Sequence, residues 1–333
     1  MEGSKKERLY IFDNMKVYLI FLVVVGHILV NGIHENQILR SIYYFIYLFH
    51  MPVFVFISGY FSKNIEKCRD QAIQNFLIPY VTFSVLMYGF NILITFEAGA
   101  IPSFSIMRPS WGLWYLLAMF LWRMLLKDLV RIRFILPLCI VASLLTGMSR
   151  EFTSYLTIGR VVSLMVFFVL GYYCNYEWVK KIRKIPKIVG ALAVAVTYGI
   201  SVIMVYIFEI EREFIYMKKG YPEGEDLKGM LVRLAVYIGA FLMIFAILNL
   251  ASDKKRWYSY MGGNSICAYV FHLFIIILIE NYVSLPTNPL AFFITTIVIA
   301  FVVVGVLTLP AVRRVYDKII EIVNAIVYKK DKA

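Results

Sequence analysis

The sequence predicts an all-α, polytopic membrane protein with about ten transmembrane helices and both termini in the cytoplasm. Hydrophobic residues make up 61% of the 333 residues. Apolar runs of about twenty residues recur along the chain, and that length spans a hydrocarbon core roughly 30 Å thick. Basic residues gather in every second connecting segment, as expected of a protein that crosses the bilayer repeatedly. We therefore expect a multi-pass protein of the cell membrane.

The expected spans follow the apolar runs in chain order. They lie near residues 14–31, 39–61, 76–97, 112–127, 133–148, 158–176, 187–208, 229–250, 263–281 and 290–312.

The basic residues set the orientation. With a cytoplasmic N-terminus, 24 of the 34 lysines and arginines fall on cytoplasmic segments and seven on outer segments. The remaining three, Lys16, Arg160 and Arg233, lie within spans. This positive-inside bias accounts for the net charge of +13, so the charge does not indicate nucleic-acid binding.

The chain is expected to form one integral-membrane domain over residues 1–333, with residues 313–333 as a basic cytoplasmic tail. Residues 1–14 are polar, so no cleavable signal peptide is expected. The acidic outer segment 209–228 is interpreted as a solvated loop, and a lid over an outer site is the alternative. None of the four cysteines lies on an outer segment, which implies no disulfide framework. No residue spacing resembles a metal site.

The first span carries three ionisable residues, Asp13, Lys16 and His27. Ionisable groups inside a bilayer are costly, so they suggest a functional site. Asp13 and Lys16 can pair as i,i+3 neighbours. Lys16 is either a snorkelling anchor or a contact for a ligand that enters from the cytosol. Lys16 and His27 are about 16 Å apart along a helix, at about 1.5 Å per residue.

His27 is a candidate general base, because burial favours a neutral imidazole that can take a proton from a hydroxyl. The alternative is a structural hydrogen bond between helices. Asp13 lies about 21 Å away along the helix, so any partner that orients His27 must come from another helix.

The second span contains FHMPVFVFISGYF, with His50 and Pro52 near its middle. Pro52 should kink the helix and free the carbonyl of Leu48, which His50 or a ligand could satisfy. A purely structural hydrogen bond is the alternative for His50. Gly59 allows close packing near the inner end.

Five residues are candidates to bind an acceptor or to line its pocket: His50, Trp111, Trp114, Arg160 and His272. Trp111 and Trp114 begin the fourth span, where an aromatic belt is the default and stacking on a sugar is the alternative. Arg160 lies about one turn into the sixth span and either snorkels or binds hydroxyl or acidic groups.

The ninth span, GGNSICAYVFHLF, carries His272 near its middle. Asn264 and Ser265 can cap its cytoplasmic end, and together with the preceding glycines they form a possible phosphate seat.

These motifs together resemble the membrane acyltransferase-3 family, particularly its fucose O-acetylase-like branch. The resemblance rests on the Lys16 to His27 spacing with Asp13 before it, on FHMPVFVFISGYF, WGLWYLLAMF and GGNSICAYVFHLF, and on the Arg160 segment ending VLGYYC. It implies acyl transfer, usually of acetyl, from cytosolic acyl-CoA to a sugar hydroxyl at the outer face. It also makes His27 the catalytic candidate and Lys16 a donor contact.

The chain departs from the family pattern in two places. Many members carry a closely spaced arginine pair after the second span, whereas this chain has Lys63, Lys67 and Arg69. Lys63 and Arg69 are therefore the candidates for the donor phosphates, beside Asp13 and Lys16. No appended extracellular esterase-like domain is expected, so the acceptor would be acylated within the membrane domain. No nucleophile suggests an acyl-enzyme, and we expect direct transfer.

The predicted function is O-acyl transfer to a cell-surface or lipid-linked sugar. Acetyl-CoA is expected as a co-substrate, with no bound cofactor and no metal. The expected partners are acyl-CoA, a glycan or other hydroxyl acceptor, and the bilayer. A proton-coupled transporter is the alternative, because three histidines within spans could form a proton relay. The lack of a visible internal repeat counts against it. A non-catalytic subunit of a glycan-assembly complex is a third possibility.

Overall fold

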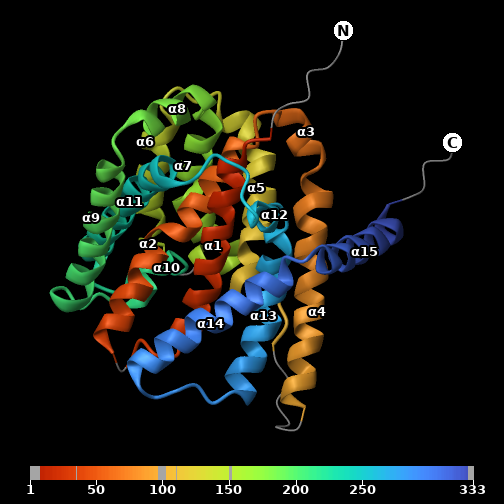
Figure 1. Ribbon diagram of the computed structural model, residues 1–333. Coiled ribbons are helices and arrows are strands. Elements are labelled where there is room, and N and C mark those ends of the chain that lie inside the picture. The colour runs from red at the N-terminus through yellow and green to blue at the C-terminus, as the bar shows by residue number, and fades with distance from the viewer. Residues whose placement is uncertain (1–7, 35, 97–102, 110, 150–151, 329–333) are drawn as a thin grey trace.

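A computed structural model confirms the all-α membrane class. The structure describes residues 8–34, 36–96, 103–109, 111–149 and 152–328, without the side chains of residues 111 and 152–154. Within these ranges every regular element is a helix. Eight helices are long and apolar enough to cross a bilayer (Figure 1).

The helices, in chain order, are α1 (Tyr10–Leu29), α2 (Gln37–Tyr60), α3 (Ile65–Asp70), the π-helical turn η1 (Ile73–Leu77), α4 (Ile78–Thr95), the 3-10 turn η2 (Trp111–Leu113), α5 (Trp114–Leu129), α6 (Ile135–Thr146), the 3-10 turn η3 (Phe152–Thr157), α7 (Ile158–Tyr173), α8 (Tyr176–Lys184), α9 (Lys187–Tyr206), α10 (Arg212–Tyr216), α11 (Asp226–Leu250), α12 (Ser259–Gly263), α13 (Ser265–Tyr282), α14 (Pro289–Leu307) and α15 (Pro310–Val327).

Eight of the ten predicted spans coincide with these long helices, whereas the fourth and fifth do not reach their length. The fourth corresponds to α5, which has 16 residues, and the fifth to α6, which has 12. Twelve residues extend about 18 Å at 1.5 Å per residue, well short of the hydrocarbon core. The described helices thus support eight spans by length, and the count of ten stays a prediction.

Helix α1 occupies the centre of the bundle, with α2, α12, α13 and α14 packed around it (Figure 1). Phe12, Leu19 and Val24 on α1 are completely buried. This burial explains why α1 is apolar on all sides rather than amphipathic. Asp13 and Asn14 on α1 are buried as well, so these polar groups lie inside the protein, where they can form part of a site.

Glycines let α2 and α7 touch along their backbones. A side chain at Gly59 would collide with the Phe168 carbonyl, and one at Gly171 would collide with the Phe56 carbonyl. Small residues at helix contacts allow such close approach in membrane proteins. The prediction that Gly59 permits close packing is confirmed, and the contact fixes α2 against α7.

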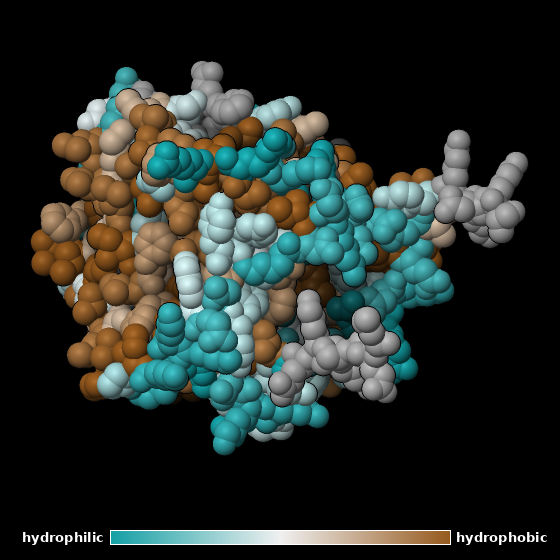
Figure 2. All heavy atoms as spheres, turned by 90° about the horizontal axis from the view of Figure 1, so that it is seen from above, coloured by the Kyte–Doolittle hydropathy of each residue, from teal (hydrophilic) through white to brown (hydrophobic). Residues whose placement is uncertain are grey.

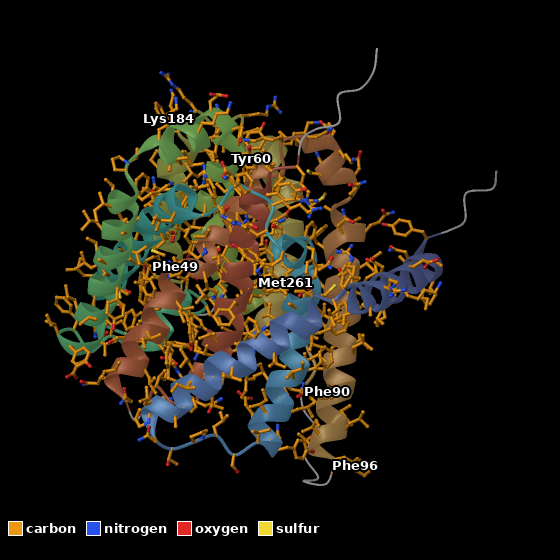
Figure 3. All side chains as sticks on the ribbon, in the orientation of Figure 1. Phe49, Tyr60, Phe90, Phe96, Lys184 and Met261 are labelled. Atoms are coloured by element: carbon orange, nitrogen blue, oxygen red, sulfur yellow. The ribbon has the colours of Figure 1, made fainter. Side chains whose placement is uncertain are left out.

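Polar side chains gather at the end of the bundle where α1 begins. Figure 2 views this end and shows a hydrophilic band across it, with hydrophobic residues on the left flank. Figure 3 shows Tyr60 and Lys184 near this end, and Phe96 at the far end of α4. The long, apolar flank and the polar end are what a membrane-embedded bundle requires.

Helix α15 projects sideways from the bundle (Figure 1). It is amphipathic, and Ile322 and Ile326 are exposed while Tyr316 is buried. Tyr316 stacks on Phe83 of α4, with ring centroids 5.7 Å apart. A helix of this kind is typical of a membrane surface. The predicted tail is thus helical over Pro310–Val327, and its cytoplasmic position stays a prediction.

Candidate functional site

Two cavities lie inside the bundle and share part of their walls. The first, here called the Lys16 cavity, has a volume of about 460 Å³ and is lined by residues of α1, α2, η1, α4, α5, α12, α13 and α15. The second, the His27 cavity, has a volume of about 350 Å³ and lies toward the other end of α1. Met51 and Tyr269 line both. The two predicted polar ends of α1 therefore face two adjoining chambers.

His27 lines the His27 cavity, and its ring lies beside that of His272. The two ring centroids are 5.1 Å apart. His272 is completely buried and is not among the residues that line either cavity. The structure therefore places His272 behind His27 rather than in the acceptor-side wall where sequence analysis placed it.

Hydrogen bonding defines the free nitrogen of His272. Its Nδ1 lies 2.9 Å from the Ala268 carbonyl oxygen, which can only accept, so Nδ1 carries the proton. In the neutral ring the lone pair is then on Nε2. This atom is buried and has no hydrogen-bond partner among the described residues. An unsatisfied acceptor thus sits beside the candidate base.

His50 and Pro52 also line the His27 cavity. The Nδ1 of His50 donates to the Ile46 carbonyl at 2.7 Å. The prediction that His50 could satisfy the Leu48 carbonyl is therefore wrong, because the imidazole reaches back a full turn to residue i−4. This bond leaves Nε2 as the acceptor of the neutral ring.

Arg160 and Trp114 meet in the wall of the His27 cavity. The Arg160 guanidinium carbon lies 4.8 Å from the centroid of a Trp114 ring. The Arg160 Nε donates to the Tyr216 carbonyl at 3.0 Å. Arg160 thus points inward rather than snorkelling. The side chain of Trp111 lies outside the described residues.

The segment 209–228 contributes to the same cavity. Its short helix α10 and the residues after it supply Arg212, Ile215, Tyr216, Met217 and Lys218 to the wall. Ile215 and Met217 are buried. The segment is therefore better described as a cover over the cavity than as a solvated loop, because its apolar side chains pack onto the bundle.

Lys16 lines the Lys16 cavity and is paired with Asp13. The Lys16 Nζ lies 3.5 Å from Asp13 Oδ1, and the Arg8 Nε lies 2.7 Å from Asp13 Oδ2. The predicted i,i+3 pair is therefore present. Asp13 itself is buried and does not line the cavity.

Lys63 and Arg69 do not line the Lys16 cavity. The Lys63 ammonium instead donates to the carbonyls of Tyr172 and Cys174 at the end of α7. Cations near helix C-termini stabilise the exposed carbonyls. Lys63 therefore has a structural partner, and a donor-binding role for it or for Arg69 finds no support in their positions.

The beginning of α13 differs from the predicted cap. Neither Asn264 nor Ser265 makes a side-chain capping bond. The Asn264 amide donates instead to the Thr308 carbonyl at 2.8 Å and joins α13 to the end of α14. Ser265 lines the Lys16 cavity together with Gly262 and Gly263. The glycine–serine turn thus faces the same chamber as Lys16.

Sequence reasoning missed two arginines of the Lys16 cavity, Arg123 and Arg313. The Arg313 Nε lies 2.9 Å from both carboxylate oxygens of Asp317. The Arg123 guanidinium carbon lies 4.5 Å from the Phe76 ring centroid, and its Nε is buried without a partner among the described residues. An arginine within the apolar run of α5 was a signal that could have found Arg123.

The π-helical turn η1 was also missed. It places Gln74, Asn75 and Phe76 in the wall of the Lys16 cavity. Single π turns occur often at functional sites because they redirect side chains. No group of His, Cys, Asp and Glu side chains that could hold a metal ion occurs in the described part of the chain.

Comparison with known proteins shows the family. The acyltransferase-3 family, described as an acyltransferase domain, matches residues 9–309. The chain therefore belongs to this family.

The chain is also similar to two curated proteins, both named nodulation protein NolL. It is 34% identical over 126 residues to the Sinorhizobium fredii protein, which covers 33% of this chain and 34% of the relative. It is 28% identical over 118 residues to the Mesorhizobium japonicum protein, which covers 31% and 32%. The chain thus spans about a third of the length of the curated relatives it matches. No solved structure matches it.

Proposed function

We propose that this membrane acyltransferase moves an acetyl group from cytosolic acetyl-CoA to a hydroxyl of a cell-surface or lipid-linked sugar. The observation that carries the proposal is the shared wall of the two cavities at Met51 and Tyr269. One cavity holds cations suited to a polyanionic donor, and the other holds a histidine suited to proton transfer. An acyl group at their junction lies within reach of both.

The donor enters the Lys16 cavity in this proposal. Lys16, Arg123 and Arg313 supply positive charge to its wall, and Ser265 supplies a hydroxyl. Charge-assisted hydrogen bonds to phosphate are among the stronger ones in proteins. The phosphates bind at this end, and the long pantetheine arm carries the thioester toward Met51 and Tyr269. Asp13 positions Lys16 rather than touching the donor.

The acceptor occupies the His27 cavity. His27 takes the proton of the acceptor hydroxyl while the hydroxyl oxygen attacks the thioester carbonyl. The carbon–sulfur bond then breaks, and the CoA sulfur leaves as a thiolate that takes up the proton from His27. One ester forms, one thioester is broken, and His27 returns to its neutral form.

His272 orients His27 in this scheme. A general base needs its second nitrogen held by an acceptor that stabilises the charge developing during reaction. Among the described residues that line the His27 cavity there is no carboxylate. The Nε2 atom of His272 is unpartnered and belongs to the ring beside His27, and in this proposal it accepts the His27 N–H.

The test is acetyl-CoA turnover by purified protein in nanodiscs, with release of free CoA as the readout. His27→Ala should reduce turnover by about 10² to 10⁴-fold, the range for loss of a general base. Binding of acetyl-CoA should persist, because His27 lines the other cavity. Ile28→Ala is a matched control, since Ile28 is buried on the same helix and lines neither cavity.

Unchanged turnover in folded His27→Ala would remove His27 from the mechanism. Failure of the wild-type protein to bind acetyl-CoA would reject acetyl-CoA as the donor.

A further inference from the structure

The charges around the His27 cavity are unbalanced. Three cationic side chains line it, Arg160, Arg212 and Lys218, and no acidic side chain does so among the described residues. Arg212 is neutralised by Glu213, whose Oε1 lies 3.2 Å from its Nε. Arg160 and Lys218 have no ion-pair partner within the described ranges. Two positive charges therefore face this chamber without a protein anion.

Arg160 is held rigidly while its terminal amino groups stay available. Its Nε donates to the Tyr216 carbonyl, and its guanidinium faces Trp114. These two contacts fix the plane of the Arg160 guanidinium group. Its Nη1 and Nη2 make no hydrogen bond to the described residues, and the side chain lines the cavity. The two terminal amino groups of Arg160 are thus positioned to bind a ligand in the His27 cavity.

An unpaired guanidinium within a membrane-spanning helix is costly. A ligand that brings the missing negative charge removes that cost. Two parallel N–H bonds of an arginine match a carboxylate or a phosphate better than a neutral hydroxyl. Trp114 beside the guanidinium supplies a flat apolar surface of the kind that can pack against a sugar ring.

We propose that the acceptor is an anionic sugar whose carboxylate or phosphate binds Arg160 and Lys218 in the His27 cavity. The proposal rests on the function proposed above and adds the charge of the substrate. Arg160 forms hydrogen bonds with the anionic group, and Lys218, on the segment that covers the cavity, adds electrostatic attraction. A hydroxyl of the same sugar then contacts His27.

The experiment compares pairs of sugars that differ in one anionic group. Methyl glucuronide is paired with methyl glucoside, and glucose 1-phosphate is paired with glucose. Binding to purified protein in nanodiscs is measured by calorimetry, and acetylated product is measured by mass spectrometry with acetyl-CoA. An acidic sugar should exceed its neutral partner at least about tenfold in both measurements, as charged hydrogen bonds of this kind imply. The glucuronide and phosphate arms identify which anion is preferred, and either preference supports the proposal.

Variants then locate the selectivity. Arg160→Gln should abolish the difference between acidic and neutral sugars, chiefly through KM. Lys218→Gln should reduce it. Lys219→Gln is the matched control, because Lys219 is the next residue and does not line the His27 cavity. If Arg160 served the reacting carbonyl instead, Arg160→Gln would lower kcat equally for both sugars and leave their ratio unchanged.

Equal binding of the paired sugars, preference for the neutral one, or no binding of either acidic sugar would overturn the anionic acceptor. The binding measurement decides this without catalysis. Loss of acetyl-CoA binding or turnover, with acidic selectivity in binding retained, would instead reject the proposed function and leave the anion site standing.

Discussion

The two cavities differ in how their positive charges are matched. In the Lys16 cavity two of the three cations have an acidic neighbour, because Lys16 faces Asp13 and Arg313 faces Asp317; the third, Arg123, lies over the Phe76 ring. In the His27 cavity, Arg160 stands beside an aromatic ring and a backbone carbonyl. In the proposed function, the polyanionic donor can displace Asp13 or Asp317 from its cation. Arg160 has no protein anion to displace, so it favours a ligand that carries negative charge. The difference suggests a general donor chamber and a discriminating acceptor chamber.

Among the changes that test this comparison of the two cavities, the largest effect is expected from the Lys16 cavity. Lys16→Gln should raise the KM for acetyl-CoA about 30-fold, because it removes a charged hydrogen bond to phosphate. The kcat at saturating donor should change much less. Lys127→Gln is the control, since Lys127 pairs with Glu66 at 2.7 Å and lines neither cavity.

Steady-state kinetics with acetyl-CoA as the varied substrate check this prediction. A fall in kcat without a change in KM would mean that Lys16 acts in the acyl-transfer step. It would contradict the assignment of the Lys16 cavity to the donor and the His27 cavity to the acceptor.

The shared wall should set the length of the acyl group. Met51→Ala enlarges the junction between the chambers, so the ratio of kcat/KM for butyryl-CoA to that for acetyl-CoA should rise about tenfold, as expected for room for further methylenes. Met119→Ala is the matched control, because Met119 lines only the Lys16 cavity. Competition between the two donors gives the ratio directly. The same change in both variants would argue against a junction at Met51.

His272→Gln should lower kcat about fivefold, the value of one net hydrogen bond, with the KM for acetyl-CoA unchanged. A purely structural role could produce the same single-variant result. The double variant with His27→Ala separates the two, because a residue that acts through His27 adds no further loss once His27 is gone. Additive losses would make His272 a packing residue only.

The smallest effect concerns pH. Lys218 lies outside the spans, and burial, Arg160 and Lys219 lower its pKa below the ordinary lysine value. The protonated amine binds an anion, so affinity for an acidic sugar should be complete below this pKa and fall as pH rises through it. Because Lys218 is partly exposed to solvent, the change should be only about threefold. Calorimetry across alkaline pH, with Lys218→Gln showing a flatter profile, checks this.

Much of this arrangement could be predicted from the sequence, because local signals determine it. Apolar runs gave the long helices, and the i,i+3 spacing gave the Lys16–Asp13 pair. Gly59 indicated the close contact with another helix. Each of these depends on neighbours a few residues apart, or on a length that the bilayer imposes.

The remaining features depend on contacts between distant segments. Nothing local shows that Lys63 would reach the end of α7, or that His272 would lie behind His27. The cover formed by residues near Tyr216 likewise requires α2 and α7 to be in place. Such contacts arise from the packing of whole helices, which periodicity does not specify.

The glycine contact between α2 and α7 has a consequence for how the protein can work. Alternating access requires one group of helices to rock against another around a central site. Here the helix that carries Met51 is locked, backbone to backbone, against the helix that carries Arg160. Rocking of α2 against α7 would have to separate two main chains that are in direct contact. In the proposed function, the two cavities therefore keep their places at this contact, and a small chemical group crosses between them while the molecules that give and receive it stay on their own sides.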